Sequence, residues 1–157
     1  MTNIREKGEK IKEIALLFTV ALLTTVPWLG RYEIHTRGEG REALVAQAIV
    51  QGSNWILPSG YNDAVPSKPP FLHWLIAALS SPVGEVTAFT ARLPSALFSI
   101  LFISLWGYFL LQRLDKKIAI AAPLILLTTF EWARAASSCR VDLVHAATLA
   151  GGMYTFY

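Results

Sequence analysis

The sequence predicts an all-α integral membrane protein with several spanning helices. Apolar residues make up 54% of its 157 residues and the mean hydropathy is +0.43, more than a soluble domain of this size is expected to carry. Uncharged apolar runs approach the length of about 20 residues that a spanning helix needs. Basic residues gather beside the ends of these runs, which indicates a membrane topology and argues against a nucleic-acid partner.

The first apolar run, Ile14–Gly30, is expected to anchor the chain in the membrane. Four basic residues between positions 5 and 12 precede it, and the positive-inside rule therefore places the N-terminus in the cytoplasm. A cleaved signal peptide is the alternative. The run is longer than a typical signal-peptide core, and Val26-Pro27-Trp28 is a poor cleavage site, so the sequence favours an anchor.

The long polar segment 31–92 is predicted to lie on the outer side. It contains a short amphipathic helix, Glu42–Val50, and an apolar helix, Phe71–Ser81, that opens after Ser67-Lys68-Pro69-Pro70. The second helix is too short to cross a bilayer. If it does not cross, the next run ends with Arg113, Lys116 and Lys117 in the cytoplasm, as the positive-inside rule favours.

The resulting topology resembles the front part of a longer multi-spanning protein. The predicted segments are a cytoplasmic tail (1–13), a transmembrane helix (14–30), an outer loop with juxtamembrane helices (31–92), a transmembrane helix (93–112), a cytoplasmic loop (113–117), a transmembrane helix (118–133), an outer loop (134–142) and the start of a further transmembrane helix (143–157).

Two carboxylates fall on the same outer face in this topology, Glu39 and Asp142. Acidic groups at a membrane surface suit sugar transfer from a lipid phosphate, because a carboxylate can accept a proton or steady an oxocarbenium-like centre. Cations such as Lys68 suit the departing phosphate. The flat faces of Trp55 and Trp74 suit a sugar ring.

Four motifs occur in order, and together they resemble a known family. They are GEGREA (38–43), GSNWILP (52–58), SKPPFLHWL (67–75) and ARLPSA (91–96). Their order and spacing resemble the start of bacterial polyprenyl-phosphate-sugar glycosyltransferases. These enzymes are similar to the aminoarabinose lipid A transferase and the dolichyl-phosphate-mannose protein mannosyltransferases, and they share the GT-C membrane fold.

The resemblance implies a multi-spanning GT-C-like helix bundle whose first outer loop carries juxtamembrane helices. Glu39 falls on the family's acidic motif, which implies a role at the reaction centre, and Arg41 falls on its arginine. Lys68 falls on the Lys-Pro motif, which implies a place near the carrier phosphate. Asp142 falls on the acidic residue of the second outer loop.

Three positions depart from the family pattern. The family often has Asp-Glu where this chain has Gly38-Glu39, which leaves the identity of the base open. Ser67 stands where a glutamate often precedes the lysine, and His73 stands where a tyrosine is common. These departures imply a different substrate preference.

Each candidate residue also has a structural interpretation. Glu39 suits the start of a helix, where the helix dipole favours a carboxylate, and Asp142 suits a salt bridge with Arg140 or Arg134. Arg41 suits a salt bridge that orients the loop. Lys68 suits an extended position toward lipid headgroups, and Trp55 and Trp74 suit the interfacial aromatic belt.

The sequence predicts no cofactor, although a divalent metal stays open. His73 and His145 are expected to be helix residues satisfied by neighbours, and one histidine near carboxylates is too little for a metal site.

The expected function is transfer of a sugar from a polyprenyl-phosphate donor to a lipid, glycan or protein acceptor at the outer face of the bacterial inner membrane. Besides donor and acceptor, membrane lipids are the expected partners. One alternative is a transporter or flippase fragment, which would carry ionisable residues and broken helices at mid-membrane. The other is an inactive fragment of the transferase, whose site would need later spans to close.

Overall fold

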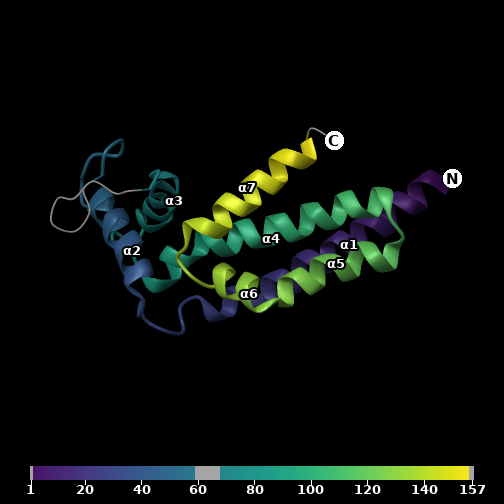
Figure 1. Ribbon diagram of the computed structural model, residues 1–157, viewed down its shortest axis with the longest axis horizontal. Coiled ribbons are helices and arrows are strands. Elements are labelled where there is room, and N and C mark those ends of the chain that lie inside the picture. The colour runs from purple at the N-terminus through teal and green to yellow at the C-terminus, as the bar shows by residue number, and fades with distance from the viewer. Residues whose placement is uncertain (1, 59–67, 156–157) are drawn as a thin grey trace.

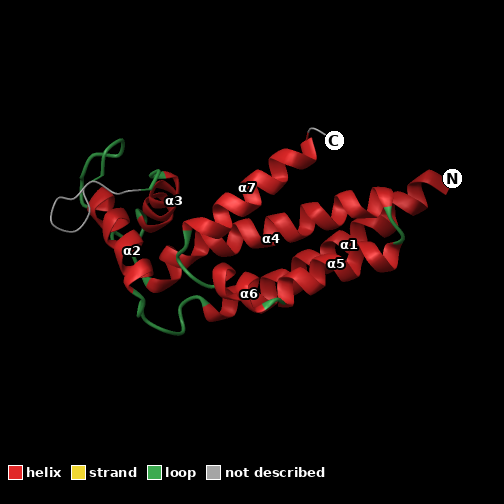
Figure 2. Ribbon diagram, viewed as in Figure 1, coloured by secondary structure: helices red, strands yellow, loops and turns green. Residues whose placement is uncertain are grey.

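In the described part of the chain, every regular element is a helix, and loops and turns connect the helices (Figure 2). A computed structural model describes residues 2–58 and 68–155. Its elements in chain order are α1 (Thr2–Thr25), the 3-10 helix η1 (Val26–Trp28), α2 (Arg37–Val50), α3 (Phe71–Ser80), α4 (Ala88–Arg113), α5 (Lys116–Thr128), α6 (Phe130–Ala136) and α7 (Val141–Thr155).

The long helices form an elongated bundle, with α2 and α3 at one end (Figure 1). Two helical stretches, Glu6–Trp28 and Ala88–Arg113, are long and apolar enough to cross a membrane. Helices α5 and α6 together make a third such stretch, but they are bent by 71° at their junction. The bend follows from Thr129, whose backbone is extended (φ −65°, ψ 137°) and cannot continue a helix.

Helices α2 and α4 begin earlier than the sequence indicated, and in both a threonine cap explains the difference. The expected amphipathic helix 42–50 begins at Arg37, because the side chain of Thr36 accepts a hydrogen bond from the Glu39 amide at 3.2 Å. The expected run 93–112 begins at Ala88, because Thr87 forms a capping box with Thr90.

Helix α4 lies at the centre of the bundle and packs against α1, α3, α5 and α7. One buried cluster joins α4 to α1 and α5, and a second joins α4 to the α2–α3 pair and to α7. The first cluster is Leu17, Ala21, Ile100, Ile103 and Leu127; the second is Ala43, Ala46, Leu72, Ile76, Ala91, Cys139 and Val144. The second cluster therefore fixes the short helices against the bundle.

The contact between α1 and α4 depends on a glycine. A Cβ atom at Gly107 would collide with Leu17, which is fully buried, and would lie 3.7 Å from Pro123 Cγ. Gly107 therefore leaves room for the buried end of the Leu17 side chain where the two helices pack.

We predict that Gly107→Leu lowers the stability of the bundle, because overpacking a filled core costs about 1–3 kcal/mol. The unfolding temperature in detergent measures this. Gly151→Leu is the matched control, since Gly151 is also helical and has no atom within 4 Å of an added Cβ. Equal unfolding temperatures for the two variants would contradict the proposed close packing.

Candidate active site

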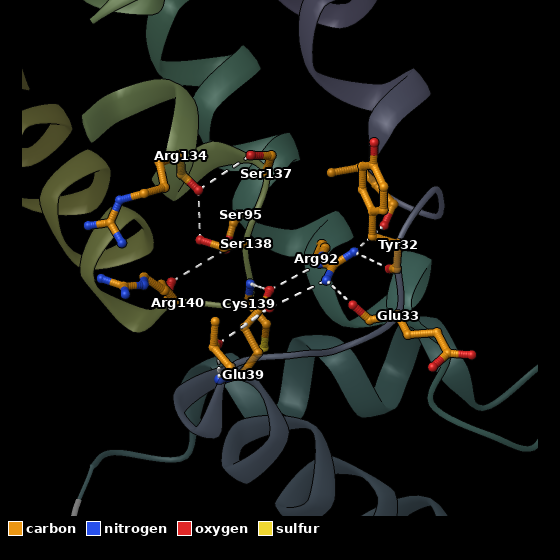
Figure 3. A network of polar contacts seen from close by, with 12 residues as sticks. Tyr32, Glu33, Glu39, Arg92, Ser95, Arg134, Ser137, Ser138, Cys139 and Arg140 are labelled. Carbon is orange, nitrogen blue, oxygen red and sulfur yellow. Dashed lines mark hydrogen bonds and ion pairs between the residues drawn. The ribbon is translucent and has the colours of Figure 1, made fainter. Parts of the chain in front are cut away.

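Arg92, near the start of α4, has a buried guanidinium group that forms hydrogen bonds with distant parts of the chain (Figure 3). It donates hydrogen bonds to the carbonyl oxygens of Leu29 at 2.8 Å, Tyr32 at 2.7 Å and Glu33 at 3.0 Å. It also forms a two-point ion pair with Glu39, with Nε 3.0 Å from Oε1 and Nη2 3.3 Å from Oε2. Arg92 therefore ties the connection after α1 to the first turn of α2.

Glu39 also accepts a hydrogen bond from the segment before α7. The backbone N–H of Cys139, just before α7, donates to its Oε1 at 2.9 Å. Burial raises the pKa of Glu39, but the Arg92 hydrogen bonds, the Cys139 amide, the Arg92 charge and Thr36 together bring the pKa below its usual value. Glu39 is therefore an ionised carboxylate whose two oxygens are already occupied.

Glu42, one helical turn further along α2, forms a second buried site with different partners. Its Oε2 lies 2.6 Å from Nε2 of His73 on α3, and its Oε1 lies 3.5 Å from Nζ of Lys68. The His73 side chain is fully buried, whereas that of Lys68 is 39% exposed. Burial raises the pKa of Glu42, but the His73 hydrogen bond and the Lys68 charge are among the contacts that bring it below its usual value.

Asp142 lies in the first turn of α7 with its side chain exposed. Its contact with Arg140 is long, at 4.0 Å, and Arg134 pairs instead with Glu131 at 2.6 Å. Asp142 soon follows Cys139, whose backbone amide is bound to Glu39. No direct contact joins the two carboxylates.

The remaining predicted substrate-binding residues lie on the surface. The indole N–H of Trp74 donates to the Trp55 carbonyl oxygen at 2.5 Å, so these two tryptophans are brought together, each partly exposed. Arg41 is exposed on α2 and forms no ion pair within the described residues. Ser67, one of the departures from the family pattern, lies outside the described residues.

The sequence did not assign roles to Glu42 and Arg92, although both lie inside the quoted motifs. The signal that was available for Glu42 is its spacing from Glu39, because residues three apart share one helix face. Within residues 2–58 and 68–155, no three His, Cys, Asp or Glu side chains are grouped to hold a metal ion.

We predict that Glu39→Gln destabilises the protein by about 3–5 kcal/mol, because it leaves the buried Arg92 charge without its partner. The native pKa of Glu39 is lowered, so its stabilisation is present above the pKa of the unfolded chain and is lost as the pH falls through the native pKa. Unfolding measured between pH 7 and pH 3 should therefore show a smaller acid loss in the variant. Glu131→Gln, at an exposed pair, is the control and should change stability by less than about 0.5 kcal/mol.

We also predict that the Cys139 thiol resists alkylation in the folded protein. Cys139 is 1% exposed, and its burial, with the nearby Glu42 and Glu39 charges, raises the pKa of the thiol to about 12. Only about one thiol in ten thousand would then be ionised at pH 8. Maleimide labelling followed by mass spectrometry should be slow for the native chain and fast after denaturation; fast native labelling would contradict the buried position.

The comparisons with known proteins agree with the motif resemblance. No family model matches the chain. The chain is 29% identical over 121 residues to the undecaprenyl phosphate-α-4-amino-4-deoxy-L-arabinose arabinosyl transferase of Pseudomonas savastanoi pv. phaseolicola. This match covers 76% of this chain and 22% of the relative. The crystal structure of ArnT from Cupriavidus metallidurans bound to undecaprenyl phosphate matches with a TM-score of 0.77 at 24% identity.

That structural match covers 87% of this chain and 25% of the ArnT chain, so the chain spans about a quarter of the length of the proteins it matches. The likeness in fold extends over nearly all of the sequence. The resemblance that the four motifs indicated is confirmed: this chain is similar to part of the aminoarabinose transferases and has their GT-C membrane fold.

Proposed function

We propose that this chain is part of a membrane glycosyltransferase that moves a sugar from a polyprenyl-phosphate carrier to an acceptor. The observation that carries this proposal is the joint likeness, in sequence and in fold, to a transferase named for an undecaprenyl phosphate donor and to a structure that binds undecaprenyl phosphate. The aminoarabinose named for the relative is the first sugar to test, and lipid A is the first acceptor, ahead of glycan or protein.

We infer that α2 and α3 face the outer side of a bacterial inner membrane and that the N-terminus is cytoplasmic. The N-terminus and the α4–α5 connection lie at the same end of the bundle, opposite α2 and α3 (Figure 1). Both of these segments are basic, as cytoplasmic segments tend to be. An ion pair between Lys116 and Glu13, at 2.5 Å, joins the two segments.

In this proposal Asp142 supplies the reaction-centre carboxylate. An acceptor hydroxyl attacks the anomeric carbon of the sugar, the bond from that carbon to the carrier phosphate oxygen breaks, and the hydroxyl proton passes to Asp142. Lys68 and Arg41 bind the phosphate, which gains charge as it departs. Trp55 and Trp74 pack against the sugar.

The sequence placed Glu39 at the reaction centre. In the proposed enzyme we assign it a structural role instead. Its oxygens are already bound to Arg92 and to the Cys139 amide, so it holds the segment before α7, the helix that carries Asp142. A carboxylate that must accept a proton needs an oxygen within reach of the substrate, and Asp142 is the exposed member of the pair.

A transporter is supported by one observation, the bend of 71° between α5 and α6. In transporters such breaks lie at mid-membrane, where they bind the cargo. Here the residues beside the break, Leu127 and Phe130, line one cavity with Thr25, the last residue of α1, and with Trp28 of η1. The break therefore lies at the level of the C-terminal end of α1 and not at the middle of that helix. This position favours the glycosyltransferase over the transporter.

We predict that Asp142→Asn lowers sugar transfer by about 10²–10⁴-fold, the usual contribution of a positioned acid or base. The assay uses membranes containing the protein, radiolabelled undecaprenyl-phosphate-aminoarabinose and lipid A. Lys68→Met should raise KM for the donor, whereas Glu85→Gln, at an exposed loop position, should change neither constant.

Full transfer by Asp142→Asn would remove Asp142 from the mechanism but leave the transferase. If the wild-type protein transfers no sugar but moves the labelled donor across the bilayer, the proposed function is wrong and the transporter is favoured.

A further inference from the structure

The Glu42–His73–Lys68 group is not used by the mechanism above, except through Lys68. Glu42 is 4% exposed and His73 is fully buried, which is unusual for ionisable side chains. Burying them is unfavourable unless they are paired. The pair connects α2 to α3 directly and reaches the partly exposed Lys68, which precedes α3.

The hydrogen-bond pattern defines the protonation of this group. The Nδ1 atom of His73 is buried without a hydrogen-bond partner among the described residues. If Nδ1 carried a proton, the site would bury an unpaired N–H and a second positive charge, which is more unfavourable than a bare acceptor nitrogen. The Nε2–H of His73 therefore donates to Oε2 of Glu42.

That bond fixes how the Glu42 carboxylate is oriented. With Oε2 bound to His73 at 2.6 Å, the carboxylate turns Oε1 toward Lys68. The separation of 3.5 Å from Oε1 to Nζ is longer than a charge-assisted hydrogen bond of 2.7–2.9 Å. Glu42 therefore pairs with the ammonium group through a long contact, and the partly exposed Lys68 still has Nζ–H donors for another anion.

We propose that Glu42 and His73 are positioning residues that hold the Lys68 ammonium group ready for the phosphate of the lipid carrier. The proposal rests on the proposed function for the identity of that phosphate. A free lysine side chain loses conformational freedom when it is fixed. Fixing it before the ligand arrives moves this loss out of the binding step.

The Glu42 carboxylate also has an opposite effect on phosphate binding. The Glu42 carboxylate repels a phosphate bound to the same lysine, and removing it would relieve that repulsion. Lys68 is partly exposed, so solvent and salt screen this repulsion. The proposal therefore expects loss of Glu42 to weaken binding, and the sign of the change tests it.

The first experiment measures binding of undecaprenyl phosphate to the purified protein in detergent by native mass spectrometry. Glu42→Gln and His73→Leu should each weaken binding by about tenfold. His73→Gln should bind like wild type, because its amide N–H replaces Nε2–H. In a Lys68→Met background, Glu42→Gln should cause no further loss, since both changes remove the same contact. Glu85→Gln is the matched control.

Three outcomes would overturn the proposal: tighter binding by Glu42→Gln, additive losses in the double variant, or equal losses for His73→Gln and His73→Leu. A general effect on folding would make the losses additive. If wild type binds and Lys68→Met does not, while both Glu42 and His73 variants bind normally, the positioning role fails and the proposed function stands.

A second measurement needs no carrier. Acetylation of Lys68 by acetic anhydride, followed by mass spectrometry, reports how firmly its amine is held. Lys68 should be acetylated faster in Glu42→Gln and in His73→Leu than in wild type. In His73→Gln it should be acetylated at the wild-type rate. If the carrier fails to bind wild type but these labelling differences appear, the proposed function is wrong and the positioning contact is retained; unchanged labelling overturns the contact.

Discussion

The bidentate ion pair between Arg92 and Glu39 is the interaction on which the site-bearing end of the structure depends. A buried guanidinium group is tolerable only when its donors are satisfied, and here three backbone carbonyls and one carboxylate satisfy them. The carbonyls come from the segment that follows α1, and the carboxylate comes from α2. One side chain on the central helix therefore determines where the chain goes after it leaves its first apolar helix.

The rest of this end is built around that pair. The Cys139 amide brings the segment before α7 to the same carboxylate, and Ser95 donates to the Arg140 carbonyl oxygen at 3.4 Å from the next turn of α4 (Figure 3). The apolar cluster that includes Leu72, Ile76 and Val144 then packs α3 and α7 onto α4. Polar contacts set the register and apolar contacts supply the burial, so Asp142 lies on a packed helix and Lys68 lies just before one.

The sequence predicted the helical class, the short helices beside the bundle and the likeness in fold, because hydropathy and motif order are local properties of the chain. It did not predict the partners of the buried charges. Arg92 and Glu39 are separated by 53 positions and Cys139 and Glu39 by 100, and no periodic pattern indicates which distant groups meet. The bend at Thr129 was also missed, since an apolar run with one threonine pair looks continuous in composition.

The two buried glutamates of α2 illustrate why burial alone does not identify a reactive group. Glu39 and Glu42 lie on the same helix, are 5% and 4% exposed, and both have pKa values below the usual one. Glu39 meets a planar arginine that binds both of its oxygens, and its bonding capacity is used inside the fold. Glu42 meets a histidine on one oxygen and a partly exposed lysine at 3.5 Å on the other. The Glu39–Arg92 arrangement can only hold the chain together. The Glu42–Lys68 arrangement leaves a cation at the surface that can donate further hydrogen bonds. The chemistry of the partner therefore distinguishes the roles of the two glutamates.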